Sequence, residues 1–274
     1  MKTLKLIALC LFTTAYAFAA NVSSIQKDAL IAFYNATNGS NWNTKWDLSA
    51  DVSTWYGITL ENNQVTEINL PFNNLQGELP QEIANLTSLK KLNLGFNKIS
   101  GNIPASLSDL QDLTSLELFM NAFEGDIPSE LGSLKNLQSL KLYSNKLTGK
   151  IPASLMQLTN LEELLLGSNF LTGTIPTNID ALSKLKKLSL MDNKLEGEIP
   201  VQIGNLNNLE ELLLSTNNLT GDLPIELINL KKLSTVMVSD NNLNEEYISL
   251  SGKNPPGMMT INTNATAVLD IEKE

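Results

Sequence analysis

The chain reads Leu89-Lys90-Lys91-Leu92-Asn93-Leu94-Gly95-Phe96-Asn97-Lys98-Ile99-Ser100-Gly101-Asn102-Ile103-Pro104, and this pattern returns every 24 residues from Val65 without insertion or deletion. The marker asparagines of the successive units are Asn73, Asn97, Asn121, Asn145, Asn169, Asn193, Asn217 and Asn241. A fixed period of this length predicts a solenoid, because one unit cannot bury its own leucines and must stack on its neighbours.

The first part of each unit predicts a short strand. Leu89, Leu92 and Leu94 are separated by polar residues such as Lys91 and Asn93, which is the period of two expected for a strand with one buried face. Stacked units then form one parallel sheet. The marker asparagine follows each strand. There its side-chain amide can form hydrogen bonds, as donor and as acceptor, with backbone groups of neighbouring coils that have no partner in the sheet. We therefore expect a structural ladder of asparagines inside the solenoid.

The second part of each unit predicts bends. A glycine, from Gly77 to Gly221, is followed three residues later by a proline, from Pro80 to Pro224, in seven successive units. These residues fix turns and suppress a continuous helix. Aliphatic residues such as Leu107 then return inward, so that each coil buries about five or six aliphatic side chains. Both ends of the array need caps.

These residues resemble the plant-type subclass of leucine-rich repeats, whose LxGxIP half-repeat occurs in plant receptor-kinase ectodomains, in polygalacturonase inhibitors and in secreted bacterial proteins. The resemblance covers most of the chain. It implies a right-handed, curved and twisted solenoid of the α/β-type repeat class, mostly strand and loop, with a concave parallel sheet and about eight repeats plus caps. It also implies recognition of a protein, peptide or glycan.

Residues 20–64 are similar to the N-terminal cap of that family. Ser23 with Gln26 predicts a capping-box start of a short helix, which should end at Asn38-Gly39. Plant members carry cysteines at the positions of Ser53 and Leu60, so this cap lacks the disulfide and favours a bacterial form. The tryptophans Trp42, Trp46 and Trp55 are expected to cover the first coil rather than to bind a ligand.

The sequence divides into a signal peptide (1–19), the N-terminal cap (20–64), the repeat array (65–244) and a C-terminal cap and tail (245–274). The signal is predicted from Lys2 and Lys5, an apolar run and a small-residue cleavage site at Ala17-Phe18-Ala19, and it implies a secreted or cell-surface protein. The apolar run is too short for an integral membrane segment. Cys10, the only cysteine, lies within the signal.

The composition argues against several functions. A net charge of -10, with lysine as the only basic residue type, disfavours nucleic acid as a partner. The chain has no histidine and no cysteine beyond the signal, so a Ser-His-Asp triad, a Cys-His pair and a usual zinc site are excluded. We expect no metal and no cofactor.

Carboxylate chemistry is the remaining catalytic possibility. Glu163 and Glu211 should lie two strands apart in one column, roughly 9 to 10 Å, which is near the separation of an inverting glycosidase. Lys187 falls between them. A second column of Glu162, Lys186 and Glu210 alternates in the same way, as do the pairs Glu67 with Lys91 and Glu117 with Lys141. Opposite charges on adjacent strands stabilise a sheet, so we expect a self-neutralised surface and no enzyme.

The concave face should also carry apolar side chains, which are the candidate ligand-binding residues: Phe72, Phe96, Phe119, Met120, Tyr143, Leu165, Met191, Leu213 and Met237. Contiguous exposed apolar area usually marks a contact site. The alternative is that the rings stack between coils and cover backbone. Aromatic ladders suit sugars and peptides alike, so the class of ligand stays open at this stage.

The sequence therefore predicts a secreted, non-enzymatic protein that binds a protein, peptide or glycan through the concave face. The main alternative is a structural or adhesive surface protein, whose repeat array acts as a spacer or self-associates. A polysaccharide-active enzyme is less favoured. The oligomeric state is left open.

Overall fold

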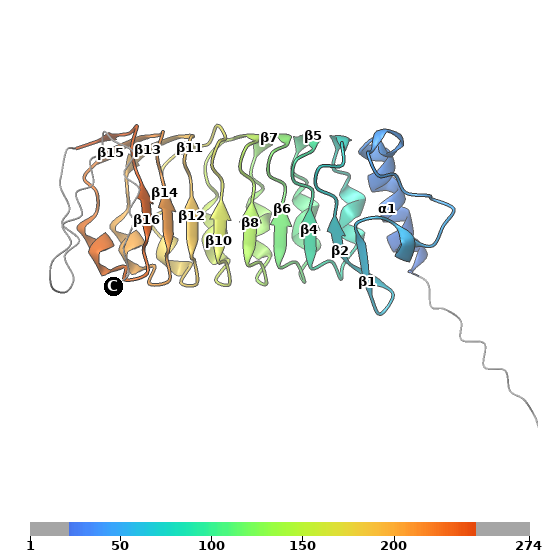
Figure 1. Cartoon of the computed structure of the whole chain (residues 1–274). Coiled ribbons are helices and arrows are strands. Elements are labelled where there is room, and N and C mark those ends of the chain that lie inside the picture. Colours follow the sequence, from blue (N-terminus) through green and yellow to red (C-terminus); the bar gives the residue numbers. More distant parts are fainter. Residues whose placement is uncertain (1–21, 245–274) are drawn as a thin grey trace, which may run out of the picture.

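The computed structural model describes residues 22–244 and has the form of an elongated stack of coils (Figure 1). The predicted signal peptide with Cys10, and the predicted tail 245–274, lie outside the described residues. Successive coils place their strands side by side along one face, as the 24-residue period predicts. The predicted leucine-rich repeat solenoid is confirmed.

The main sheet has nine strands in the order β1-β2-β4-β6-β8-β10-β12-β14-β16. From β2 onward neighbouring strands are parallel, and the pairing steps by 24 residues, as in Glu163 opposite Lys187 and Lys187 opposite Glu211. The strands are β1 (Ile58–Glu61), β2 (Gln64–Asn69), β4 (Lys91–Asn93), β6 (Ser115–Glu117), β8 (Ser139–Lys141), β10 (Glu163–Leu165), β12 (Lys187–Ser189), β14 (Glu211–Leu213) and β16 (Thr235–Met237).

The N-terminal edge of this sheet is closed by a hairpin that the repeat pattern did not predict. Strand β1 pairs antiparallel with β2, and the turn between them contains Asn62 and Asn63 at φ 50° and 62°. Both values lie in the left-handed region, which asparagine tolerates and which tight hairpin turns require. The hairpin covers an edge that would otherwise present unpaired backbone groups.

Two further sheets run along the flank of the solenoid, and they were not predicted either. One has the order β3-β5-β7-β9 and the other the order β11-β13-β15-β17. Their strands are β3 (Gln76–Glu78), β5 (Lys98–Asn102), β7 (Ala122–Asp126), β9 (Lys146–Thr148), β11 (Thr172–Gly173), β13 (Lys194–Glu198), β15 (Asn218–Gly221) and β17 (Asn242–Leu243). The repeated glycines lie on this flank. Gly149, for example, has φ 71°, and an added Cβ there would lie 2.4 Å from Asp126 Oδ1.

Short 3₁₀ turns complete the coils on the side opposite the main sheet. They span Gln81–Asn85, Ala105–Asp109, Ser129–Ser133, Ala153–Gln157, Ile179–Ala181, Val201–Asn205 and Ile225–Asn229. Between the strands and these turns lies one continuous aliphatic core, in which residues such as Leu92, Leu107 and Leu116 are fully buried. Because each coil contributes to this core on both sides, neighbouring coils stabilise one another.

The marker asparagines hydrogen-bond backbone groups both within a coil and between coils. Asn145 Nδ2 donates to the carbonyls of Leu118 and Leu142, each at 3.0 Å, and its Oδ1 accepts the N–H of Phe123 at 3.1 Å. The same set of bonds surrounds Asn97, Asn121, Asn169, Asn193, Asn217 and Asn241.

The first marker asparagine bonds to the N-terminal cap. Asn73 Oδ1 accepts the N–H of Thr44 at 2.6 Å, and Asn73 Nδ2 donates to the carbonyl of Thr44 at 3.1 Å. Thr44 thus supplies the backbone groups that a further coil would supply.

The cap itself consists of helix α1 (Ser24–Ala36), 3₁₀ turns at Gly39–Asn41 and Val52–Thr54, and strand β1. Ser23 caps the helix by accepting the N–H of Gln26 at 3.4 Å. The predicted capping box is only half formed, because the Gln26 side chain turns away and accepts the N–H of Val65 at 2.8 Å. This bond ties the helix to the first coil.

The three tryptophans form the core of the cap. All are at most 5% exposed, and the Trp46 ring lies 4.8 Å from Trp42 and 4.7 Å from Trp55 between ring centroids. Each indole N–H donates to a backbone carbonyl at 2.9 Å. Buried aromatic rings with satisfied polar atoms serve packing rather than ligand contact.

Candidate ligand-binding face

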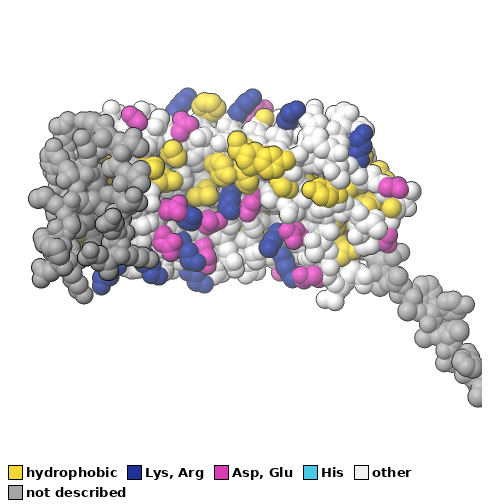
Figure 2. All heavy atoms as spheres, viewed as in Figure 1, with side chains coloured by type: hydrophobic (Ala, Val, Ile, Leu, Met, Phe, Trp, Pro, Cys, Tyr) yellow, Lys and Arg dark blue, Asp and Glu magenta, His cyan; other side chains and the backbone are white. Residues whose placement is uncertain are grey.

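The face of the main sheet that points away from the core carries the predicted site. We call it the strand face: the outward side chains of the strands, with the two residues that precede each marker asparagine. Figure 2 shows apolar side chains in a band along this face, beside a group of charged side chains. Phe72, Phe96 and Met120 are 63%, 37% and 41% exposed. The partly exposed members are Phe119, Tyr143, Leu165, Met191, Leu213 and Met237.

Four rings form a continuous aromatic stack across four coils: Phe72, Phe96, Phe119 and Tyr143. Phe72 lies parallel to Phe96, with 4.0 Å between ring centroids and 16° between planes. Phe96 meets Phe119 edge to face at 5.3 Å. Phe119 then stacks on Tyr143 at 4.7 Å and 14°. The sequence predicted rings in adjacent coils, but their mutual orientation depends on side-chain rotamers.

Part of this stack serves packing. Gly95 is buried, and an added Cβ there would lie 2.5 Å from the Phe119 ring, so Phe119 lies over Gly95. Met191 covers Gly167 in the same way, with Met191 Cγ 3.1 Å from an added Cβ. Burial also raises the pKa of the Tyr143 hydroxyl. Phe119 and Met191 therefore cover backbone, and the partly buried Tyr143 stacks on Phe119, whereas Phe72, Phe96 and Met120 are exposed to solvent.

The projecting residues occupy an unusual backbone position. The residue before each marker asparagine has a positive φ in every coil: Phe72, Phe96, Met120, Ser144, Ser168, Asp192, Thr216 and Asp240, with φ between 52° and 59°. Small or polar residues fill the last five positions, whereas the first three carry Phe, Phe and Met. A bulky side chain in the left-handed region costs about 1 to 3 kcal/mol, and such strain clusters at functional sites.

We predict that Met120→Asn stabilises the protein by about 0.5 to 1 kcal/mol, because asparagine tolerates the left-handed region. The measurement is the free energy of unfolding in urea. Met191→Asn is the matched control, since Met191 is a partly exposed methionine of the same face that lacks a positive φ. Equal destabilisation by the two changes would show that Met120 carries no backbone strain.

Most side chains of the charged columns form ion pairs, but the columns are not fully neutralised, because Glu210 forms none with the described residues. Lys187 Nζ lies 2.8 Å from Glu211 Oε1, and Lys186 Nζ lies 2.6 Å from Glu162 Oε2. Lys141 bridges Glu117 at 3.3 Å and Glu163 at 3.1 Å. These partly exposed pairs each contribute little stability, but together they hold the side chains in place.

The ionisation of Glu163 argues against a role as the general acid of a glycosidase. Burial acts to raise the pKa of Glu163, but hydrogen bonds from Lys141 and Ser139 outweigh it, so the pKa falls below its usual value. Burial likewise acts to lower the pKa of Lys141, but the bond to Glu163 and the charge of Glu117 raise it overall. A general acid needs a raised pKa, so the lowered pKa of Glu163 does not suit that role.

One expected pair is not formed. Glu67 lies opposite Lys91 in the parallel register, but the two make no ion pair. The cause is the unpredicted strand β1, which places Thr59 opposite Glu67 and lets the Thr59 hydroxyl donate to its carboxylate at 3.5 Å. Glu61 of the same strand pairs with Lys90 at 2.5 Å.

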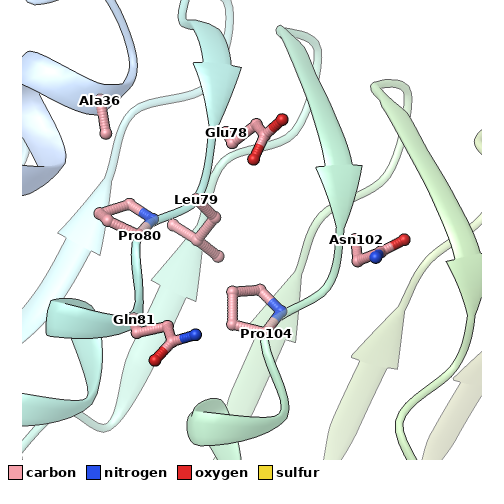
Figure 3. Close-up of a pocket in the computed structure, with 7 residues that line it drawn as sticks. All are labelled: Ala36, Glu78, Leu79, Pro80, Gln81, Asn102 and Pro104. Atoms are coloured by element: carbon pink, nitrogen blue, oxygen red, sulfur yellow. The ribbon is translucent and has the colours of Figure 1, made fainter.

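A shallow hollow of about 390 Å³ lies on the flank and not on the strand face. It is lined by Ala36, Glu78, Leu79, Pro80, Gln81, Asn102 and Pro104 (Figure 3). Glu78 and Asn102 point in the same direction rather than towards each other, and each lies against a glycine of the next coil. Their side chains therefore do not converge on a ligand.

Within residues 22–244, no cluster of three or more His, Cys, Asp or Glu side chains has the arrangement of a metal site. The same part of the chain contains no helix with the length and apolarity needed to span a membrane.

Comparison of this chain with known proteins agrees with the solenoid fold. Residues 88–110, 136–158, 160–182, 184–206 and 208–230 match the family model described as Leucine Rich Repeat. None of the curated proteins matches the chain.

Three solved structures illustrate the likeness. The PEPR1–AtPEP1 structure is 36% identical, with a TM-score of 0.72, over 79% of this chain and 31% of that chain. The Arabidopsis receptor kinase HAESA, in complex with the peptide hormone IDA and the co-receptor SERK1, is 37% identical, with a TM-score of 0.62, over 70% of this chain and 31% of that chain. A plant ice-binding protein is 26% identical, with a TM-score of 0.58, over 87% of this chain and 91% of that chain.

The chain thus spans about a third of the length of the first two structures. An unbroken stack of coils in 24-residue register, with five of its repeats matched to the family, makes this chain a leucine-rich repeat protein.

Proposed function

We propose that this protein is a secreted, non-enzymatic binding protein that recognises a polypeptide through its strand face. We further propose that it belongs to the plant-type, 24-residue subclass, in a bacterial form whose N-terminal cap lacks cysteines. The observation that carries the proposed function is the row of bulky, solvent-exposed Phe72, Phe96 and Met120 at left-handed positions. Folding alone favours small or polar residues at those positions, so contact with a partner is the reason to keep large apolar ones.

The geometry of the aromatic stack favours a polypeptide over a glycan. Sugar rings pack on the open face of an aromatic ring. Phe72 and Phe96 have their faces against each other, and so do Phe119 and Tyr143. Stacking thus covers one face of each ring and reduces the open face available to a sugar, while the ring edges, which carry positive partial charge, suit carbonyl oxygens. The peptide hormone bound to HAESA supports the same class of ligand.

A second candidate function is adsorption to an extended surface, which corresponds to the alternative of an adhesive protein. It is favoured by the match to the plant ice-binding protein, which covers 91% of that chain. The difference between the melting and freezing temperatures of a solution of the purified protein separates the two candidates. A polypeptide-binding face produces no such difference, whereas ice adsorption does.

We predict that peptide binding depends on the aromatic stack and not on the charged columns. Peptides selected from a random display library against the purified protein provide the ligand. Phe96→Ala, Phe119→Ala and Tyr143→Ala should each weaken binding by about 2 kcal/mol, or roughly 30-fold, because desolvated aromatic residues dominate interface energies. Lys187→Ala should have little effect, since Lys187 already pairs with Glu211.

The measurement is the dissociation constant by calorimetry, after circular dichroism has shown that each variant folds. Phe96→Ala is the most direct variant, because Phe119 also covers Gly95. The prediction is wrong if the three aromatic variants bind like the parent protein while Lys187→Ala abolishes binding. The ligand would then be recognised through charged side chains, and the aromatic stack would only pack the coils.

A further inference from the structure

The two halves of the strand face differ in charge. In the half formed by β1 to β8, Glu61, Glu67 and Glu117 are balanced by Lys90, Lys91 and Lys141. In the half formed by β10 to β16, six carboxylates face two lysines, which leaves an excess of four negative charges. These residues are Glu162, Glu163, Glu210, Glu211, Asp192 and Asp240 against Lys186 and Lys187. We call this part the acidic half.

Three of these carboxylates form no ion pair with the part of the chain that the structure describes. Lys186 pairs with Glu162, Lys187 pairs with Glu211, and Lys141 reaches Glu163 from the neighbouring strand. Among residues 22–244, no ion pair within 4.0 Å involves Asp192, Glu210 or Asp240. Both aspartates are exposed, and Glu210 is partly exposed.

The aspartates continue the row that carries the projecting apolar residues. Asp192 and Asp240 hold the same left-handed position before a marker asparagine as Phe72, Phe96 and Met120. One row of the face therefore changes from large apolar side chains at its N-terminal end to carboxylates at its C-terminal end. A ligand that lies along this row would contact apolar side chains at one end and carboxylates at the other.

We propose, building on the proposed function, that the ligand is an extended polypeptide segment with an apolar part and a cationic part. The apolar part lies on the aromatic stack, and Lys or Arg side chains lie on Asp192, Glu210 and Asp240. From Phe72 to Asp240 the row crosses seven strand spacings, about 34 Å at ~4.8 Å each, which an extended chain covers with about ten residues at ~3.3 Å each. A free carboxylate is disfavoured on this face, because the chain contains no arginine and the excess charge is negative.

The first experiment selects peptides from a random twelve-residue display library on the immobilised protein. The expected result is enrichment of peptides that carry a block of Phe, Trp or Leu and a separate block of Lys or Arg. Enriched peptides that are acidic or uncharged, and whose binding depends on Phe96, overturn the charge inference but leave the proposed function standing. Failure to enrich any peptide that binds the purified protein overturns both.

The second experiment places the cationic block on the acidic half. The probe is one enriched block peptide, compared with a version in which its basic residues are glutamine. The triple variant Asp192→Asn, Glu210→Gln and Asp240→Asn should weaken binding of the basic peptide roughly tenfold at low salt and leave the glutamine version unaffected. Added salt should reduce this difference, because it screens exposed charges.

A matched triple variant controls for net charge. Glu124→Gln, Glu130→Gln and Glu196→Gln remove three exposed carboxylates from outside the strand face. This variant should change the dissociation constant of the basic peptide less than about twofold, since long-range attraction between screened charges is weak. Equal weakening by the two triple variants would overturn the inference, because the peptide would then respond to overall charge and not to the acidic half.

Discussion

Replacing Trp42 with alanine should lower the free energy of unfolding by roughly 3 to 5 kcal/mol, the largest loss that we expect from a single change. The Trp42 side chain is 2% exposed, and its ring lies 5.0 Å from Tyr34 and 4.8 Å from Trp46 between centroids. Its indole N–H also donates to the carbonyl of Thr37 at 2.9 Å. Alanine removes these contacts and leaves a cavity between the helix and the first coil.

The measurement is urea unfolding followed by circular dichroism. In a solenoid each coil is stabilised by its neighbours, so loss of the cap should shift the transition of the whole array rather than of the cap alone. Tyr56→Ala is the control, because Tyr56 is an aromatic residue of the same cap that is 50% exposed. Comparable losses for Trp42→Ala and Tyr56→Ala would contradict the assignment of the tryptophans as the core of the cap.

Asn145→Leu should destabilise the protein by roughly 1 to 3 kcal/mol. The carbonyls of Leu118 and Leu142 would each keep a bond from another marker asparagine, Asn121 and Asn169 respectively. The N–H of Phe123 would lose Asn145 Oδ1, the acceptor it has at 3.1 Å. The loss of stability therefore comes mainly from the buried N–H of Phe123, which is left without an acceptor, and from the lost hydrogen bonds of the Asn145 amide.

Lys146→Ala provides the comparison for this change, because Lys146 follows Asn145 directly and its side chain is exposed. Thermal and urea unfolding of both variants give the two losses of stability. If Asn145→Leu loses no more stability than Lys146→Ala, the asparagine side chains do not contribute to folding through these hydrogen bonds.

The repeat period predicted most of the fold, because a fixed spacing determines register. With 24 residues per coil, Glu163, Lys187 and Glu211 must fall on adjacent strands, and they do. The same periodicity placed the candidate apolar residues in adjacent coils. It gave no sign of strand β1, since residues 58–61 stand outside the repeat. Glu67 and Lys91 do lie opposite each other on adjacent strands, but they form no ion pair, because β1 supplies Thr59 next to Glu67.

The details of the candidate site depend on backbone dihedral angles and side-chain rotamers, which the repeat pattern does not predict. The positive φ at Phe96 follows from the turn between strand and asparagine, and a phenylalanine there is contrary to residue preference. The face-to-face contacts of Phe72 with Phe96 and of Phe119 with Tyr143 depend on side-chain rotamers. The flank sheets form where the spacing of the coils brings short segments of neighbouring coils side by side. Their strands pair over only a few residues.

The bond between Thr44 and Asn73 makes the end of the array interchangeable with its interior. Thr44 offers to Asn73 a backbone donor and acceptor, the same groups that one coil offers to the next. Removal or duplication of a whole 24-residue segment would leave an asparagine facing the cap and every later coil in register. Evolution, or a protein engineer, can therefore lengthen the array, shorten it or exchange its coils as modules, and so change the strand face without altering the cap.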